Sequence, residues 1–207
     1  MEVSPRFWDK VAYKYSRRPI ADEASYQEKL RKSQSYFRPD IELLEFGCGT
    51  GGTAIIHAPH VKHIRAIDIS PKMIEIAKSK AEAAGVENVE FEVQTIEELD
   101  APDGSFDAIL GLSIMHLVKD KDAVLRKVFR LLKPGGVFIS STVCMGDLAM
   151  LIPYVVPIMQ FFGLAPFVAF FNREELLESI KAAGFDIDYE WRPGKRKAVF
   201  IVARKAV

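Results

Sequence analysis

The chain has few of the residues that mark several classes of protein. Only two cysteines, Cys48 and Cys144, occur in 207 residues, and they form no Cys-x-x-Cys pair, so neither a disulfide framework nor a zinc site is indicated. Lysine plus arginine total 28, as do aspartate plus glutamate, which leaves no basic surplus for binding nucleic acid. The first residues contain no apolar signal core. We therefore expect a cytoplasmic protein with no metal site and no nucleic-acid partner.

The length predicts one domain over residues 1–207, with helices in residues 1–40. In residues 5–16 the apolar and aromatic positions recur at helical spacing. They are Phe7, Trp8, Val11, Ala12 and Tyr15. A second, more polar helix is expected over residues 22–36. We expect the segment 1–40 to form a helical lid next to the main domain, with ordinary packing of an amphipathic helix as the alternative.

From residue 41 onward, strands and helices alternate. Strands are expected at 41–47, 62–68, 88–93, 106–112 and 137–143, with the clearest helices at 70–84 and 120–132. Asn172 and Glu175 form the capping-box pattern at the start of the last helix. The last two strands, 185–191 and 198–204, are joined by a link too short for a crossover. The pattern predicts a mostly parallel α/β sheet closed by an antiparallel hairpin.

A glycine-rich turn follows the first of these strands. Gly47, Gly49 and Gly52 fit G-x-G-x-x-G, and Asp68 stands at the tip of the next strand. This pattern indicates a nucleotide-type cofactor site, either for a dinucleotide that moves hydride or for S-adenosylmethionine. Glu45 lies two residues before the first glycine, where a negative charge is unfavourable near pyrophosphate but acceptable near a sulfonium and an ammonium. The closing hairpin also disagrees with an all-parallel dinucleotide fold.

The motifs together resemble those of the class I S-adenosylmethionine-dependent methyltransferases, over roughly residues 41–204. They are Glu-Phe-Gly-Cys-Gly-Thr-Gly (45–51), Asp68, Val-Gln-Thr-Ile-Glu-Glu-Leu (93–99), Ser-Phe-Asp-Ala-Ile (105–109), Leu-Leu-Lys-Pro-Gly-Gly (131–136) and Ala-Gly-Phe (183–185). The resemblance implies a Rossmann-like seven-stranded sheet of order 3-2-1-4-5-7-6, with strand 7 antiparallel. It also implies S-adenosylmethionine as the cofactor.

The resemblance assigns cofactor contacts by position. The residues assigned are Tyr15, Glu45, Gly47, Cys48, Gly49, Asp68, Ile69, Met73, Thr95, Ile96, Gly111 and Leu112. Asp68 would bind the ribose, with a helix-capping role as the alternative. Thr95 stands where the family often has an aspartate that binds the adenine amino group, and a threonine replaces that contact only in part. Trp8 and Tyr15 would cover the cofactor.

Chemistry is expected at the end of the fourth strand, where Ser113 and His116 would face the methyl acceptor. A histidine can act as a base near neutral pH, and a structural cap on the following helix is the alternative. The other histidines, His57, His60 and His63, are expected on the surface.

Residues 147–171 form a long apolar insert with no charge after Asp147 and three prolines. Because both flanks must join one sheet, we reject a membrane-spanning helix. A lid over an apolar acceptor is favoured, with a homodimer contact or a peripheral membrane patch as alternatives. Five phenylalanines would line this lid: Phe161, Phe162, Phe167, Phe170 and Phe171.

The sequence thus predicts a methyltransferase that acts on a small, hydrophobic acceptor. A non-catalytic S-adenosylmethionine-binding or membrane-docking protein is the first alternative. An oxidoreductase on a Rossmann fold is the second.

Overall fold

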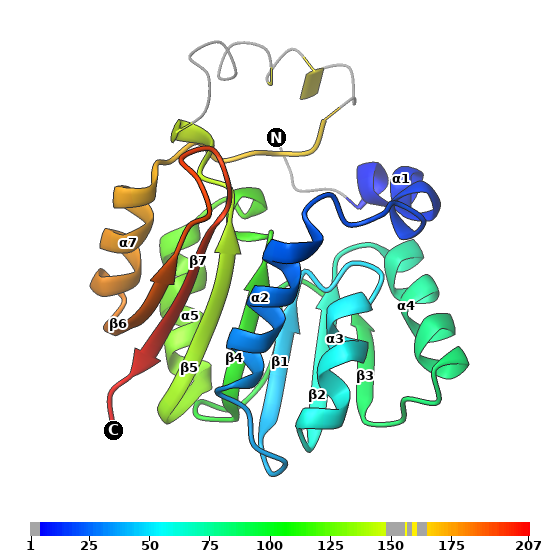
Figure 1. Ribbon diagram of the computed structural model, residues 1–207, viewed down its shortest axis with the longest axis horizontal. Helices are drawn as coiled ribbons and strands as arrows, with labels where there is room; N and C mark the ends of the chain where they lie inside the picture. The colour runs from blue at the N-terminus through cyan, green and yellow to red at the C-terminus, as the bar shows by residue number, and fades with distance from the viewer. Residues whose placement is uncertain (1–4, 148–155, 157–158, 161–164) are drawn as a thin grey trace.

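A computed structural model describes residues 5–147, 156, 159–160 and 165–207 (Figure 1). Within these residues, seven strands form one sheet of order β3-β2-β1-β4-β5-β7-β6. The strands are β1 (Glu42–Phe46), β2 (His63–Asp68), β3 (Val89–Val93), β4 (Phe106–Leu112), β5 (Leu132–Thr142), β6 (Phe185–Trp191) and β7 (Val199–Lys205). Strands β1 to β5 pair in parallel, and β7 pairs antiparallel with both β5 and β6. The predicted α/β class, strand order and reversed last strand are confirmed.

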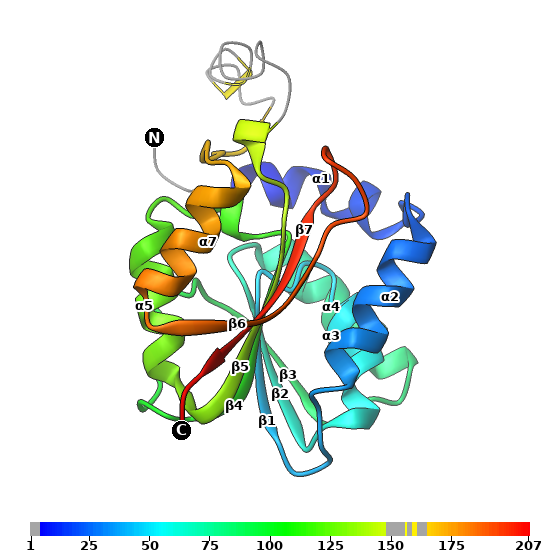
Figure 2. The same cartoon turned by 60° about the vertical axis from the view of Figure 1, so that its left-hand side comes forward.

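Helices cover both faces of the sheet and make three layers. They are α1 (Arg6–Ser16), α2 (Glu23–Gln34), α3 (Gly52–His57), α4 (Pro71–Ala83), α5 (Lys121–Leu131) and α7 (Arg173–Ala182). Figure 2 shows α2, α3 and α4 on one face and α5 and α7 on the other. Helix α1 lies across the upper end of the sheet, above the start of α4 (Figure 1). The carboxyl ends of the parallel strands therefore open beneath α1.

Each face of the sheet has its own apolar core. On one face Leu125 and Val128 of α5 pack with Leu176 of α7 and the strand residues beneath them. On the other face Ile64 of β2 and Ala77 of α4 belong to a second cluster. All of these side chains are buried, and burying one large apolar side chain stabilises the fold by roughly 1.5–3 kcal/mol. Both cores leave the carboxyl ends of the strands free for a site.

The residues expected to begin two helices do so. Ser70 Oγ accepts a hydrogen bond from Met73 N at 3.1 Å at the start of α4. In α7, Asn172 Oδ1 accepts from Glu175 N, and Glu175 Oε2 accepts from Asn172 N. Such caps satisfy backbone N–H groups that have no partner within the helix. The start of α4 is thereby held close to Asp68.

The strand expected at 137–143 begins earlier than predicted. Strand β5 starts at Leu132, and its register against β4 shifts between the pairs Phe106–Leu132 and Ala108–Val137. Gly135 has a positive φ of 76°, which allows the chain to bulge without leaving the sheet. The Lys-Pro-Gly-Gly segment is therefore an irregular part of the strand rather than a loop before it.

One histidine expected on the surface is buried. His57, the last residue of α3, has no exposed surface, and its Nδ1 lies 3.4 Å from Gln34 Nε2. The ring of Phe37 meets the imidazole edge-on at 5.0 Å, and Nε2 has no hydrogen-bond partner among the described residues. Burial, with a smaller contribution from His60, lowers the pKa of His57 to about 4.

This burial predicts a loss of stability in mild acid. The unfolded chain binds a proton on His57 near pH 6.5, whereas the folded chain does so only near pH 4. The contribution of neutral His57 to the free energy of unfolding is therefore complete above pH 6.5. As the pH falls from 6.5 to about 4, the free energy of unfolding decreases by about 3 kcal/mol. Urea unfolding measured across this range should show the loss in the wild type and in His60→Gln. If a His57→Leu variant loses as much unfolding free energy between pH 6.5 and pH 4 as the wild type, His57 is not the cause of the loss.

Candidate functional site

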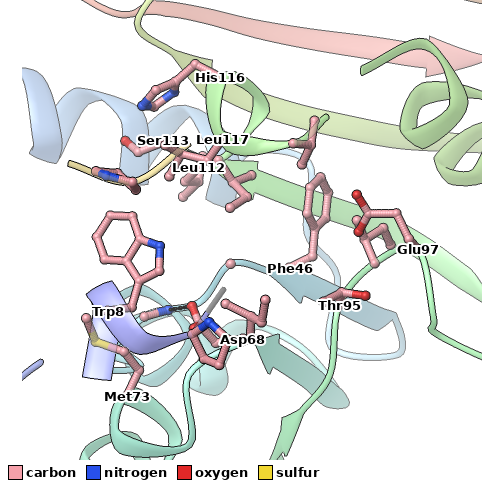
Figure 3. A pocket seen from close by; sticks show the side chains of 18 of the residues that line it. Trp8, Phe46, Asp68, Met73, Thr95, Glu97, Leu112, Ser113, His116 and Leu117 are labelled. Atoms are coloured by element: carbon pink, nitrogen blue, oxygen red, sulfur yellow. Dashed lines mark hydrogen bonds between the residues drawn. The ribbon is translucent and has the colours of Figure 1, made fainter. Parts of the chain in front are cut away.

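A cavity of about 830 Å³ opens at the carboxyl ends of the strands. Residues that follow β1, β2, β4 and β5 line it, and α1 closes one side (Figure 3). Open α/β sheets bind ligands at this edge because the strand order reverses there and leaves a crevice. The volume falls in the usual range for a small-molecule site.

The glycine turn after β1 forms the floor of the cavity. Gly47, Gly49 and Gly51 have φ values of 68°, 56° and 74°, a region that favours glycine. A Cβ at Gly47 would lie 2.7 Å from Ile114 Cγ1. Gly52, the last glycine of the G-x-G-x-x-G pattern, has no positive φ. A Cβ at this position would have no other atom within 4 Å. The conformational requirement therefore falls on Gly51 rather than Gly52.

Asp68 joins the glycine turn to the start of α4. Its Oδ2 accepts from Gly49 N and its Oδ1 from Ser70 N, both at 2.9 Å. Ser70, not Asp68, caps α4, so the helix-capping alternative is wrong. Asp68 lines the cavity, and the unused lone pairs of its carboxylate can accept hydrogen bonds from a ligand.

Two assigned residues lie behind the turn instead of lining the cavity. Glu45 is only 3% exposed, and its Oε2 has no partner among the described residues. Burial, reinforced by the charge of Asp68, raises the pKa of Glu45 to about 8. Burial and the same two acids raise the pKa of the Cys48 thiol. A cation bound on the turn would relieve this repulsion, so the acids fit a cofactor that carries positive charge.

Helix α1 supplies the wall opposite the sheet. Trp8 and Tyr15 both line the cavity, and Tyr15 Cε1 would lie 3.7 Å from a Cβ at Gly49. Asp9 Oδ1 accepts from Ser70 Oγ at 2.6 Å and from Lys72 N at 3.2 Å. These two bonds hold α1 against the start of α4. Tyr15, one of the two expected lid residues, therefore lies next to the glycine turn.

Apolar side chains that follow β2 and β3, and one from α4, also line the cavity. Ile69, Met73 and Ile96 line it, and Met73 and Ile96 are nearly inaccessible to solvent. Thr95 also lines it, but its hydroxyl pairs with Glu98 Oε2 at 3.0 Å and accepts from Glu98 N at 3.2 Å. Thr95 thus holds the turn that follows β3.

Strand β4 brings one assigned residue to the cavity and keeps another away from it. Leu112 lines the cavity, whereas Gly111 is buried beneath Phe46. A Cβ at Gly111 would lie 2.6 Å from Phe46 Cζ. The ring of Phe46 stacks on Phe138 and reaches the cavity wall. Gly111 therefore makes room for Phe46 instead of facing a ligand.

Ser113 and His116 follow β4 and lie on one side of the cavity, across from Trp8 and Asp68 (Figure 3). Ser113 has a φ of 59°, the one positive value for a non-glycine residue in the described part of the chain. Its N–H donates to Ser141 O. Burial lowers the pKa of His116, so the imidazole is neutral at neutral pH. A backbone strained in this way is most often found at functional sites.

The described part of the 147–171 insert returns over His116. Ala169 N donates to His116 O at 2.8 Å, and Pro166 and Val168 line the cavity. Of the expected aromatic residues, Phe171 completes the core, Phe170 lines a separate surface hollow, and Phe161 and Phe162 lie outside the described residues. Phe167 is half-buried and does not line the cavity. No helix in the described ranges is long and apolar enough to cross a membrane.

Sequence reasoning missed several lining residues. They are Pro5, Phe46, Gln94, Glu97, Glu98, Ile114, Leu117, Val118, Lys119, Val143 and Met145. Pro166 and Val168 also line the cavity, and they belong to the insert that was expected as a lid but were not singled out. Val143 and Met145 follow β5 directly, so the rule that ligands bind at the carboxyl ends of strands could have found them. Nothing in the sequence pattern distinguishes Leu117 or Val118 from ordinary core residues.

The chain is similar to known methyltransferases. Residues 37–187 match the family model of a methyltransferase domain. The uncharacterized methyltransferase YcgJ of Bacillus subtilis is 38% identical over 102 residues, which cover 49% of this chain and 40% of that protein. A ubiquinone biosynthesis O-methyltransferase of Xanthomonas campestris is 34% identical over 50% of this chain and 44% of its own length. The aligned region thus spans less than half the length of these curated relatives.

Solved structures agree on the fold. The YcgJ crystal structure superposes with a TM-score of 0.73 at 22% identity, covering 87% of this chain and 99% of that one. The [4+2]-cyclase SpnF gives the same score at 21% identity, covering 87% and 80%. At such low identity these likenesses show the fold alone. The family model covers most of the chain and agrees with the sheet order and the glycine turn, so the chain belongs to the class I S-adenosylmethionine-dependent methyltransferase family.

Proposed function

We propose that this protein transfers a methyl group from S-adenosylmethionine to a small acceptor with an apolar body. One observation carries the proposal. A single cavity joins a glycine turn beside acidic residues to a neutral histidine among apolar side chains. When bound on the glycine turn, S-adenosylmethionine supplies a methyl group already activated by its cationic sulfur. The chain's own residues then need to bind, align and exclude water.

The cofactor side of the cavity would use the assigned residues in two groups. The backbone of Gly47 and Gly49 approaches the cofactor closely because neither residue has a side chain, and Asp68 accepts hydrogen bonds from the ribose hydroxyls. Ile69 and Met73 pack against the adenine ring. Glu45 acts from behind the turn without direct contact, because a cationic cofactor bound there would lower the raised pKa of its carboxyl and favour the carboxylate form. The lid of residues 1–40 keeps water out through Trp8 and Tyr15.

The acceptor side would use His116 as the general base. Because burial lowers its pKa, the imidazole is free to take a proton from an acceptor hydroxyl as the new bond to carbon forms. Ser113 orients the acceptor beside it. Met145, Pro166 and Val168 also line the cavity and favour an apolar body, for which an aromatic hydroxyl compound is our choice. The similarity to ubiquinone biosynthesis O-methyltransferases supports that class.

Cofactor titration and a turnover panel test the proposal together. We expect S-adenosylhomocysteine to bind the wild type in isothermal titration, and Asp68→Ala to weaken it about tenfold or more because charge-assisted hydrogen bonds are lost. NAD should not bind. Turnover, followed as release of S-adenosylhomocysteine, should be found with apolar phenols and quinol precursors rather than with hydrophilic alcohols. Asp122→Ala, a change in the first turn of α5 outside the cavity lining, is the matched control.

Two results would oppose the proposal in different ways. Binding of NAD without S-adenosylhomocysteine would favour the oxidoreductase. Tight binding of S-adenosylhomocysteine with no turnover across the panel would favour a non-catalytic binding protein, a role that a methyltransferase fold can also host. A homodimer contact by the insert remains a separate prediction, and sedimentation would test it.

A further inference from the structure

Exposed basic side chains gather at the end of the molecule where the cavity opens. Lys10 and Lys14 of α1, and Arg17 and Arg18 directly after the helix, are all exposed. The guanidinium of Arg17 lies 4.7 Å from the centre of the Tyr13 ring, and Tyr13 is 66% exposed. The opposite side of the same helix faces the cavity through Trp8 and Tyr15. Helix α1 therefore separates the cavity from a basic surface with an aromatic residue in it.

The tip of the β6–β7 hairpin adds to this basic surface. Lys195 and Arg196 are exposed there, and both views place the hairpin tip at the same end of the sheet as α1 (Figures 1 and 2). Their neighbours Arg192 and Lys197 are paired, with Asp147 at 2.9 Å and Asp22 at 3.2 Å. The two residues at the tip thus keep their positive charge facing outward.

Three acids near this surface are engaged in hydrogen bonds or ion pairs. Asp9, the single acid of α1, accepts its hydrogen bonds from Ser70 and Lys72. Asp22 and Asp147 are held by the hairpin residues described above. These three acids are therefore already paired with other groups, and the acids Glu97 and Glu98 line the cavity itself.

We infer that α1 and the β6–β7 tip dock the protein on an anionic lipid bilayer, so that the cavity opens toward the membrane. Clusters of four to eight lysines and arginines are typical of surfaces that bind anionic lipid. Exposed Tyr13 and Ile20 suit the boundary between headgroups and acyl chains. A nucleic-acid duplex would use the charges through its phosphates and leave the apolar Ile20 in water. The inference rests on the proposed function, because an apolar acceptor partitions into the bilayer from which it would be taken.

Vesicle co-sedimentation tests this docking. Wild-type protein should bind vesicles of phosphatidylglycerol in phosphatidylcholine at low salt, bind pure phosphatidylcholine much less, and be released at high salt. The double variant Lys10→Glu, Lys14→Glu should lower the partition coefficient about tenfold or more. The matched control is Lys78→Glu, Lys181→Glu, which makes the same charge change at exposed positions in the later halves of α4 and α7.

Three outcomes would overturn the inference. They are equal binding to neutral and anionic vesicles, equal loss of binding in the test and control variants, and binding to a single-stranded oligonucleotide but not to vesicles. Titration with S-adenosylhomocysteine in the absence of lipid should give the same affinity for all variants, which shows that they fold. If the wild-type protein shows no cofactor binding or no turnover, the proposed function is wrong. Vesicle binding tests the docking separately, so the two failures can be told apart.

Discussion

Gly51→Ala should abolish cofactor binding and destabilise the protein, whereas Gly52→Ala should do neither. Gly51 precedes α3 with a φ of 74°, and a Cβ there would lie 2.8 Å from Ala77 Cβ and 2.9 Å from the Phe91 ring. The left-handed backbone alone costs an alanine roughly 1–2 kcal/mol, and the steric overlap adds roughly 1–3 kcal/mol. Relief of the overlap would push α4 and β3 away from the glycine turn.

The neighbouring glycine gives a matched control. Gly52 is the first residue of α3, has no positive φ, and has open space around a built Cβ. An alanine there gains helix propensity of up to about 1 kcal/mol. Urea unfolding and titration with S-adenosylhomocysteine should separate the two variants clearly. Equal stability and equal affinity in Gly51→Ala and Gly52→Ala would show that the turn does not require the backbone conformation described.

His116→Ala should lower turnover by about 100- to 10,000-fold on an acceptor hydroxyl, with little change in cofactor affinity. The imidazole lies beside Ser113 at the acceptor end of the cavity (Figure 3), away from the residues assigned to the cofactor. Its Nδ1 is buried without a partner among the described residues, so the ring has no competing structural bond at that atom. A base at this position acts on the acceptor and not on cofactor binding.

The pH profile separates a base from a structural histidine. Because burial lowers the pKa of His116 below its usual 6.5, kcat/KM should stay flat through neutral pH. It should fall only in acid, as the imidazole gains a proton. His116→Ala should lose this acid limb, and Ser113→Ala should keep it with a smaller drop in rate. Unchanged turnover in His116→Ala would exclude the histidine as the base and leave it as a cap of the turn after β4.

The sheet could be predicted because its signals are local. Apolar runs, capping residues such as Ser70 and Asn172, and the short link of the closing hairpin each depend on neighbouring residues. The order of the strands could not be predicted from local patterns, because neighbouring strands in a parallel sheet are far apart in the chain. It was predicted from the resemblance of the motifs to those of a known family. The strand β5 was misjudged at its start because Gly135 reads as a break, whereas in the sheet it permits a bulge.

The candidate site was predictable where its residues follow strand ends. Asp68, Leu112, Ser113 and His116 line the cavity for that reason. Glu45 does not, because side chains alternate along a strand and only the tertiary packing decides which ones a ligand can reach; its side chain is buried. Gly111 does not because the ring of Phe46 occupies the space beside it.

The sequence by itself determined the fold class, the reversed last strand and the family, because periodicity, turn chemistry and ordered motifs are written along the chain. Only the tertiary structure showed that Gly51 is the position in the turn that needs a positive φ and no Cβ, and that His57 is buried. It also decided that the basic side of α1 and the hairpin tip share one end of the molecule. Each of these depends on the distance between residues remote in sequence, and that distance is set by packing.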